Sequence, residues 1–483
     1  MLSKHFWDTH YFNGFYPCRI DRYALMLPKD VPFTHRTQCT TDEPRVREVA
    51  DGVLYEWQLK NEPAIRYEQE MPGLQDIGKM LTITSLPSWD YVASWYSDLA
   101  RTKTRSTFEI KDQVADLFAG KKEMSDEERV RAIYDFITEN IRYSSVSFRQ
   151  SAYVPQRARK VLVQRLGDCK DVATLCIAML NEAGIKAHYV LVNTWDDGYN
   201  RSVPPSIAFN HCIVGVDLKS GVRHIDLTAS NYSVGSVPPV VNGAFSLAIE
   251  EGTHEPVYLG PDQFQRSDLI RRSTAMLNDD NSMTSTCASQ RYGAMSAYER
   301  SRYRNKSEAE RVKTLTEALS GDFPNVKVKS VAIRDIDRLD PCMEDTCTFT
   351  VPQFVSEAGG YKLIRMPWSD KLTASEALSY ESRSYPIVLG LGISSMAETL
   401  SVTFPPGYTL QEVPKSVTSS NPAGTYRVEY KASKGKLTGT RVFVQNKVIV
   451  TPDEYQSYKK FYNEALKEDN RQLLLKRMKY PHH

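Results

Sequence analysis

Residues 167–184, which read GDCKDVATLCIAMLNEAG, decide the centre of this sequence. The segment is apolar nearly all round a helical projection and Gly184 can close it, so it predicts a central buried helix that starts near Cys169. A cysteine at this position lies beside unpaired backbone N–H groups and the positive end of the helix dipole. Both favour the thiolate and suit an oxyanion, so Cys169 is a candidate nucleophile. The alternative is a small residue that merely starts a helix.

A thiol nucleophile needs a base, and His211 and His224 are the candidates among nine histidines. His211 begins the predicted strand FNHCIVGVDL, and the end of a strand presents a side chain to a cleft better than its middle does. Asp226, in HIDLTAS, lies on the next strand of a short hairpin, where a carboxylate can fix the tautomer of an imidazole. His224 shares a strand face with Asp226, so His211 is the preferred base. The alternative for His211 is a half-buried sheet histidine that bonds a backbone carbonyl.

The order of the three residues is therefore Cys, His and Asp. The runs GDCKDVATLCIAMLNEAGIKAHYVLVNT, FNHCIVGVDL and HIDLTAS resemble, in this order, the core of the transglutaminase-like superfamily. The resemblance covers roughly the middle third of the chain. That superfamily has a papain-like arrangement of its active site. The resemblance implies that Cys169 is the nucleophile, His211 the base and Asp226 the residue that orients the base.

Further residues are expected to support this site. Papain-like enzymes carry a side-chain oxyanion donor a few residues before the cysteine, and Gln164 is the candidate here, with a solvated helix residue as the alternative. Thr228 follows Asp226 by two residues and is expected to support the carboxylate through its hydroxyl; the alternative is a plain strand-end threonine. Tyr153 and Pro155 match a Tyr-x-Pro pattern seen before such cores, which implies a role in shaping the loop over the cleft.

Three domains are predicted. Residues 1–104 form a partial N-terminal β module, residues 105–250 the transglutaminase-like catalytic core, and residues 251–483 a C-terminal β module that ends in a helix. Both flanks resemble β modules of unknown function that accompany such cores in bacterial envelope proteins, the first without its first half. The expected fold class is α+β, with a papain-like core between antiparallel, sandwich-like β modules.

The amino-acid composition limits the kinds of partner that the protein is expected to bind. The 483 residues hold 61 Lys and Arg against 59 Asp and Glu, and the resulting net charge of +2 gives no electrostatic footprint for nucleic acid. No apolar run approaches the ~18–20 residues of a membrane helix, so no transmembrane segment is predicted. The first residues show no signal peptide. The family resemblance nevertheless favours a periplasmic or cell-envelope location, with any export signal upstream of Met1.

Cysteine spacing and short motifs limit the cofactors. Eight cysteines are too sparse for a disulfide-built scaffold, and the absence of a CxxC pair argues against structural zinc. Cys342 and Cys347 could close a small loop in an exported protein, although two unrelated thiols are the favoured interpretation. Because no phosphate-binding, dinucleotide, calcium or HExxH motif is present, we expect neither a cofactor nor a metal.

These features together predict a cysteine peptidase or amidase, or a transglutaminase-like acyltransferase, that acts on a protein or peptide through a thioester. Hydrolysis is slightly favoured over transfer, because the sequence shows no groove for an incoming lysine. The main alternative is a catalytically silent binding or scaffold protein of the cell envelope. Sugar hydrolysis is a weaker alternative, because no carboxylate pair stands out. The oligomeric state does not follow from the sequence.

Overall fold

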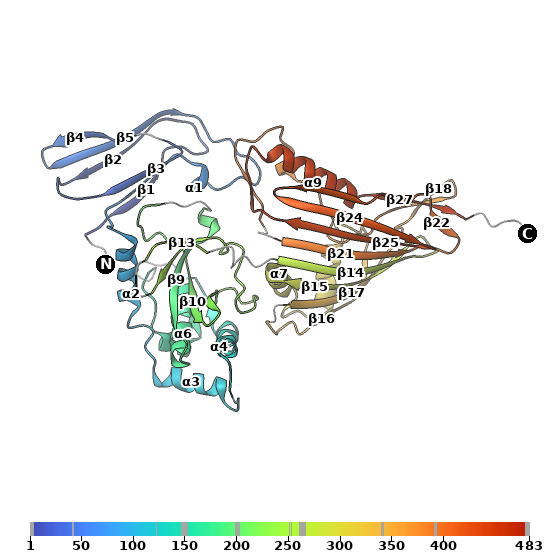
Figure 1. The fold of residues 1–483 in the computed structure, drawn as a ribbon, viewed down its shortest axis with the longest axis horizontal. Coiled ribbons are helices and arrows are strands. Elements are labelled where there is room, and N and C mark those ends of the chain that lie inside the picture. The colour runs from blue at the N-terminus through green and yellow to red at the C-terminus, as the bar shows by residue number, and fades with distance from the viewer. Residues whose placement is uncertain are drawn as a thin grey trace, which may run out of the picture. The chain divides into compact units, whose positions relative to one another are not determined.

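The computed structural model describes residues 4–40, 43–121, 123–145, 153–198, 203–250, 252, 254–259, 267–339, 342–390 and 394–478 (Figure 1). The chain forms two compact units. The N-terminal unit comprises Met1–Ser230 and Val234–Phe264, and the C-terminal unit comprises Asn231–Ser233 and Gln265–His483. The predicted domain boundaries after residues 104 and 250 stay a prediction.

The first part of the N-terminal unit holds two antiparallel three-stranded sheets, as its alternating sequence predicts. One has the order β2 (Cys18–Leu27), β5 (Gly52–Glu62), β4 (Arg45–Val49), and the other the order β1 (Trp7–Tyr11), β6 (Met80–Thr84), β3 (Thr34–Gln38). Trp57 and Leu59 of β5 pack with Leu81 and Ile83 of β6 in one hydrophobic cluster. The short helix α1 (Leu74–Ile77) precedes β6.

The rest of this unit places helices against an antiparallel sheet. The helices are α2 (Trp89–Ala100), α3 (Phe108–Phe118), α4 (Asp126–Asn140), α5 (Ala158–Gln164) and α6 (Cys169–Glu182). The sheet has the order β11 (Gly221–Ile225), β10 (His211–Leu218), β9 (Ala187–Asn193), β12 (Phe245–Ile249), β13 (Val257–Tyr258). The short strands β7 (Arg142–Tyr143) and β8 (Leu166–Gly167) pair in parallel.

Helix α6 is the central element, as its apolar sequence predicts. Every residue from Lys170 to Leu180 is buried, and the helix packs on β9, β10, α4 and α5. Burial on all sides removes so much apolar surface from water that the position of the helix, and therefore of its first residue, is fixed by packing. Helix α4 begins with a formed capping box between Ser125 and Glu128.

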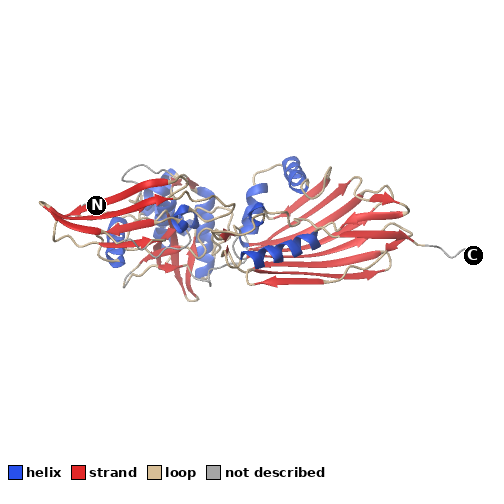
Figure 2. Ribbon diagram, turned by 90° about the horizontal axis from the view of Figure 1, so that it is seen from above, coloured by secondary structure: helices blue, strands red, loops and turns tan. Residues whose placement is uncertain are grey.

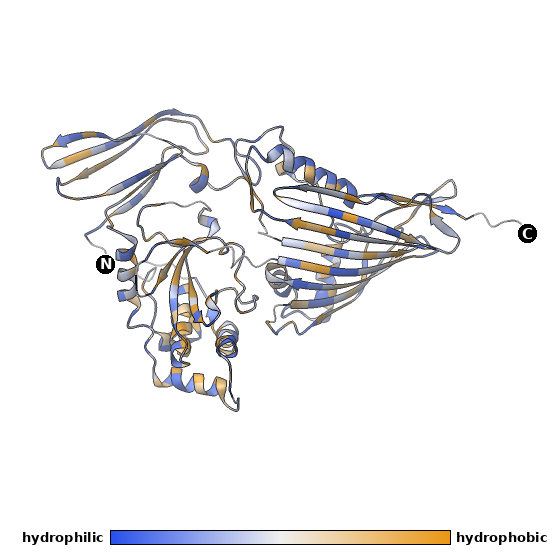
Figure 3. Ribbon diagram, in the orientation of Figure 1, coloured by the Kyte–Doolittle hydropathy of each residue, from blue (hydrophilic) through white to orange (hydrophobic). Residues whose placement is uncertain are grey.

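The C-terminal unit is built on an eight-stranded sheet with the order β16-β17-β15-β14-β21-β25-β24-β23. Its strands are β14 (Ser267–Leu277), β15 (Met283–Tyr292), β16 (Lys327–Arg334), β17 (Cys342–Val351), β21 (Ser394–Thr403), β23 (Val417–Asn421), β24 (Gly424–Ser433) and β25 (Lys436–Gln445). Strands β14 and β21 run parallel, and the other neighbours pair antiparallel. Figure 3 shows hydrophobic and hydrophilic residues in alternation along several of these strands.

A second sheet and three helices complete this unit. The sheet has the order β18 (Ser356–Ala358), β19 (Tyr361–Arg365), β27 (Gln472–Arg477), β22 (Tyr408–Leu410), and β20 (Ile387–Val388) pairs with β26 (Ile449–Val450). The helices are α7 (Gly293–Tyr303), α8 (Glu308–Leu319) and α9 (Tyr455–Asp469). Helix α9 lies along the large sheet (Figure 2), and its Tyr455, Tyr458 and Phe461 join the core cluster of the unit.

Cys342 and Cys347 cannot close a loop. Both lie on β17, and at ~3.4 Å per residue an interval of five residues separates their Cα atoms by roughly 17 Å, with the side chains on opposite faces. A disulfide needs Cα atoms about 4.4–6.8 Å apart. The two thiols are therefore unrelated, and the residue opposite Cys347 across the sheet is Cys287.

No helix among the described residues is both long and apolar enough to cross a membrane.

Candidate functional site

The start of α6 is fixed by a reciprocal cap. The Asp168 carboxylate accepts a hydrogen bond from the Asp171 backbone N–H at 3.2 Å, and the Asp171 carboxylate accepts one from the Asp168 N–H at 3.3 Å. Because this box defines the first turn, Cys169 is the first helical residue, where backbone N–H groups lack partners within the helix. The half-buried Cys169 is therefore positioned as the sequence predicts.

Asp171 also anchors the segment that precedes α5. It accepts hydrogen bonds from the backbone and side-chain nitrogens of Gln156, each at 2.7 Å. Gly167 makes this close packing possible, because a Cβ atom there would lie 2.7 Å from Cβ of Asp171. The glycine in the Gly-Asp-Cys turn is therefore required by the close approach of the chain to Asp171.

His211 is held at the first position of β10. In the sheet its neighbour is Val192 of β9. The preceding residue, Asn210, accepts a hydrogen bond from the Thr194 backbone N–H at 2.9 Å and donates one to the Thr194 hydroxyl at 2.8 Å. This double contact ties the loop to the adjacent strand at the point where the histidine side chain leaves the sheet.

Asp226 follows β11 directly, and its carboxylate contacts the His211 ring. Its Oδ2 lies 2.9 Å from Nε2 of His211, and its side chain is only 2% exposed. Thr228, the residue predicted to support the carboxylate, donates its backbone N–H and its hydroxyl to Oδ1 at 2.9 and 2.7 Å. Since Nε2 is engaged by Asp226, Nδ1 is the ring nitrogen left for Cys169, and this thiol contributes to the raised pKa of His211.

The electrostatics of this group favour a charged imidazole. Burial alone would lower the pKa of His211, but the hydrogen bonds and charges of Asp226 and Cys169 raise it to about 10. Burial alone would raise the pKa of Asp226, but the contacts with His211 and Thr228 hold it below its ordinary value. At neutral pH the site therefore contains a buried carboxylate and an imidazolium beside the cysteine.

A cavity of about 60 Å³ lies beside Cys169 and His211 in the described part of the chain. Its wall includes Trp95 of α2 and Tyr153, whose rings meet edge to face with centroids 5.9 Å apart. The Trp95 indole Nε1 is buried and has no hydrogen-bond partner among the described residues. A buried N–H donor without a partner is uncommon in folded proteins and needs an explanation.

Sequence reasoning assigned no role to Trp95. It stands 74 residues before Cys169, outside the predicted catalytic segment, and no spacing rule connects the two positions. The predicted oxyanion donor, Gln164, is exposed as the last residue of α5 and is not among the residues that line the cavity. Arg165 follows it in a left-handed conformation, with φ of 54°, and turns the chain into β8.

Comparison with known proteins identifies two domains. Residues 112–226 match the model of the transglutaminase-like superfamily, and residues 361–475 match a domain of unknown function, DUF3858. No curated protein matches the chain.

Two solved structures are similar. A candidate protease from Parabacteroides distasonis ATCC 8503 covers 98% of this chain and 75% of its own length, with 15% identity and a TM-score of 0.62. A candidate cysteine protease from Cytophaga hutchinsonii covers 52% of this chain and 86% of its own, with 14% identity and a TM-score of 0.24. The first likeness shows a shared fold. The middle of the chain is therefore a transglutaminase-like domain within an α+β protein, as the sequence resemblance implied, and a domain of unknown function follows it.

Proposed function

We propose that the chain is a thiol enzyme that acts on amide bonds, with Cys169 as nucleophile, His211 as base and acid, and Asp226 as the residue that orients His211. The observation that carries the proposal is a doubly supported carboxylate that bonds one imidazole, with that imidazole and a cysteine at a helix start lining the same cavity. This is the arrangement of nucleophile, base and orienting group that acyl transfer needs.

The reaction proceeds in two halves. The Cys169 thiolate attacks the amide carbonyl carbon, and the carbonyl electrons move to oxygen. The C–N bond then breaks, His211 gives its proton to the leaving amine, and a thioester remains. In the second half a water, or an amine, attacks the thioester while His211 takes its proton, and the thiolate of Cys169 leaves. Asp226 stays ionised throughout and stabilises the imidazolium.

Water is the favoured acceptor in this proposal. The described cavity of about 60 Å³ beside Cys169 has room for a few water molecules, whereas a lysine side chain would need a longer channel. Hydrolysis of a peptide or amide is therefore proposed ahead of cross-linking.

Trp95 is proposed as the second oxyanion donor, together with the backbone N–H at the start of α6. A buried N–H without a partner can bond a developing oxyanion, and removal of one such donor typically costs 10²–10³-fold in rate. We expect Trp95→Phe to slow turnover by about this factor while the fold is kept. Trp89→Phe is the matched control, because Trp89 lies on the same helix but packs on Phe245. Equal activity of the Trp95 variant and wild type would mean that the indole only packs against its neighbours and does not stabilise an oxyanion.

The test of the function compares wild type with Cys169→Ala in cell-envelope extracts by mass spectrometry of peptide termini and cross-links. New termini that depend on Cys169 support hydrolysis, and new isopeptide links support transfer. A second measurement follows iodoacetamide labelling, with Cys176 as the internal reference, because burial raises the pKa of that thiol. If Cys169 reacts no faster than Cys176 and no termini or links change, the chain is the catalytically silent scaffold.

The proposal includes an exported, envelope-facing location, for which the family resemblance of the sequence is the support. Fractionation of cells that make the native gene product tests it. Recovery of the protein with cytoplasmic markers alone would contradict this part of the proposal and leave the chemistry untouched.

A further inference from the structure

A second cleft lies in the C-terminal unit, with a volume of about 400 Å³. This is within the range of small-ligand sites, which span about 300–1,000 Å³. Residues 322–325, which follow α8, face residues 351–354, which follow β17, and the end of β19 with Lys371 completes the wall. With Gln472 of β27, segments from five parts of the sequence converge on one cleft, and all of them lie in the same unit.

Two cations, Lys371 and Arg365, line this cleft. Neither the Lys371 ammonium nor the Arg365 guanidinium forms an ion pair within 4.0 Å to any residue that the structure describes. The Lys371 ammonium lies over the Phe323 ring, 5.1 Å from its centroid. Burial lowers the pKa of Lys371, the charge of Asp322 opposes this effect, and the charge of Arg365 adds to it. A partly desolvated ammonium beside a second cation is a strong site for an anion.

Asp322 places a carboxylate at the same cleft as the two cations. Its carboxylate accepts the backbone N–H of Lys371 at a long 3.4 Å, and burial raises its pKa while the charge of Lys371 opposes that effect. A carboxylate oxygen accepts more than one hydrogen bond, so Asp322 keeps capacity for a donor on a ligand. Phe323 and Phe354, with ring centroids 6.4 Å apart, add an apolar wall.

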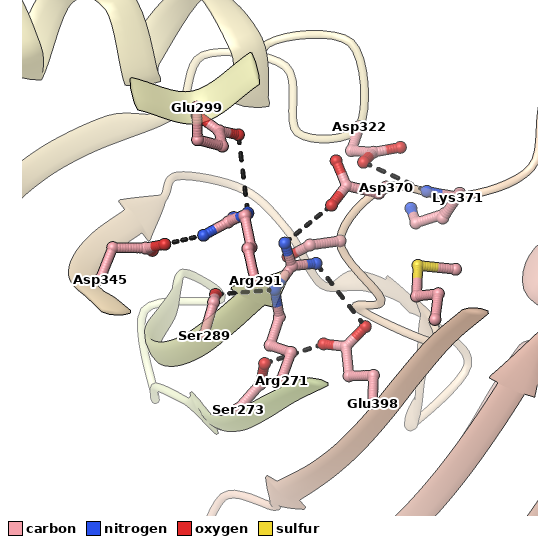
Figure 4. A network of polar contacts seen from close by, with 12 residues as sticks. Arg271, Ser273, Ser289, Arg291, Glu299, Asp322, Asp345, Asp370, Lys371 and Glu398 are labelled. Carbon is pink, nitrogen blue, oxygen red and sulfur yellow. Dashed lines mark hydrogen bonds and ion pairs between the residues drawn. The ribbon is translucent and has the colours of Figure 1, made fainter. Parts of the chain in front are cut away.

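Ion pairs and hydrogen bonds hold the loop that carries Lys371, and Figure 4 shows one of them, between Asp370 and Arg271. The Ser369 carbonyl accepts a hydrogen bond from the fully buried Arg441 at 2.7 Å, and the Asp370 carboxylate pairs with Arg271 at 2.7 Å. The Leu372 N–H donates to Asp469 at 2.9 Å. Residues on both sides of Lys371 are therefore tied to the core. Buried ion pairs are weak evidence for stability, but they fix positions well.

We infer that this cleft binds the free carboxylate end of a peptide, with the carboxylate on Lys371 and Arg365, the nearby N–H or ammonium on Asp322, and the side chain against Phe323 and Phe354. A simple inorganic anion would match the two cations but would be repelled by Asp322 and leave the aromatic wall unused. A peptide terminus can contact the two cations, the Asp322 carboxylate and the aromatic wall at the same time. This inference does not rest on the proposed function, because none of its residues belongs to the cysteine site.

The test uses the full chain with Cys169→Ala, so that no probe is consumed. Binding of the dipeptide Ala-Leu, of its C-terminal amide and of inorganic phosphate is measured by calorimetry. We expect Ala-Leu to bind, the amide to bind at least ten-fold more weakly, and phosphate not to displace the dipeptide. Lys371→Met and Arg365→Met should each weaken Ala-Leu binding at least ten-fold. Lys476→Met, which removes an exposed lysine of β27 outside the cleft, should leave it unchanged.

Several outcomes would overturn the inference. They are absence of Ala-Leu binding, equal binding of acid and amide, displacement of the dipeptide by phosphate, and equal losses in the Lys371 and Lys476 variants. Arg365 is exposed at a strand end, so its variant keeps the test valid if the Lys371 variant fails to fold. Failure of this binding test leaves the cysteine chemistry untouched, and absence of cysteine chemistry leaves this test unaffected.

Discussion

Replacement of Asp226 by Asn tests the electrostatics of the cysteine site most directly. Thr228 donates two hydrogen bonds to Oδ1 of the aspartate. An asparagine must therefore keep its oxygen on Thr228 and turn its NH₂ group toward Nε2 of His211. Nε2 then becomes an acceptor, and the ring proton is held on Nδ1, the nitrogen that faces Cys169. In this tautomer the neutral imidazole cannot accept a proton from the thiol.

The magnitude follows from the pKa of His211. A rise from the ordinary 6.5 to about 10 corresponds to roughly 5 kcal/mol at 1.36 kcal/mol per unit. Asp226 and Cys169 share this effect, and each pKa unit that Asp226 supplies corresponds to an about ten-fold change in the affinity of the ring for its proton. Because the variant also holds the ring proton on the nitrogen that should accept it, we expect alkylation of Cys169 at pH 7 to slow at least ~10-fold in Asp226→Asn.

The assay combines iodoacetamide kinetics by mass spectrometry with NMR titration of the His211 ring nitrogens. Asp217→Asn is the matched control, because Asp217 lies on β10, the strand of His211, but its carboxylate lies 3.6 Å from His188. The control should alkylate at the wild-type rate, and Asp226→Asn should move the His211 titration to a lower pH than in wild type. An unchanged rate in Asp226→Asn, or a His211 that titrates near 6.5 in wild type, would show that Asp226 does not set the protonation state of His211.

Three further predictions concern stability. Gly167→Ala should lower the free energy of unfolding by about 1–3 kcal/mol in urea, because the new Cβ lies 2.7 Å from Cβ of Asp171; wild-type stability would contradict the packing argument. Arg441→Met should cost about 3–5 kcal/mol in a thermal melt, since it leaves Asp469 buried without its ion pair at 2.6 Å; a loss below 1 kcal/mol would mean that this carboxylate finds another partner. The raised pKa of His211 stabilises the fold fully below about pH 6.5, and this contribution is lost as pH rises toward about 10. A His211→Gln variant should therefore lose less free energy of unfolding than wild type between these pH values. Parallel pH profiles of unfolding for the variant and wild type would count against this prediction.

Helices whose ends and faces depend on neighbouring residues could be predicted from the sequence. The apolar run after Cys169 predicted α6, and the Ser-x-x-Glu spacing of Ser125 and Glu128 is the helix-start pattern with which α4 begins. By contrast, the sequence pattern of β14 and β15 does not by itself indicate two long strands. Along β14 the inward positions include Ser267, Arg271 and Ser273, so the usual alternation of apolar and polar residues is absent. These polar side chains are accommodated because distant residues, such as Glu398 for Ser273, supply partners inside the unit.

The sequence by itself determined the types and order of the central elements and the three residues of the candidate triad. Capping, helical periodicity and strand alternation depend on neighbours within one or two turns, so they can be read along the chain. Only the tertiary structure decided that Trp95 rather than Gln164 lines the cavity at Cys169, and that Lys371, Arg365 and Asp322 share a cleft. Such contacts join segments tens of residues apart, and they arise from the packing of whole elements, for which the sequence carries no local signal.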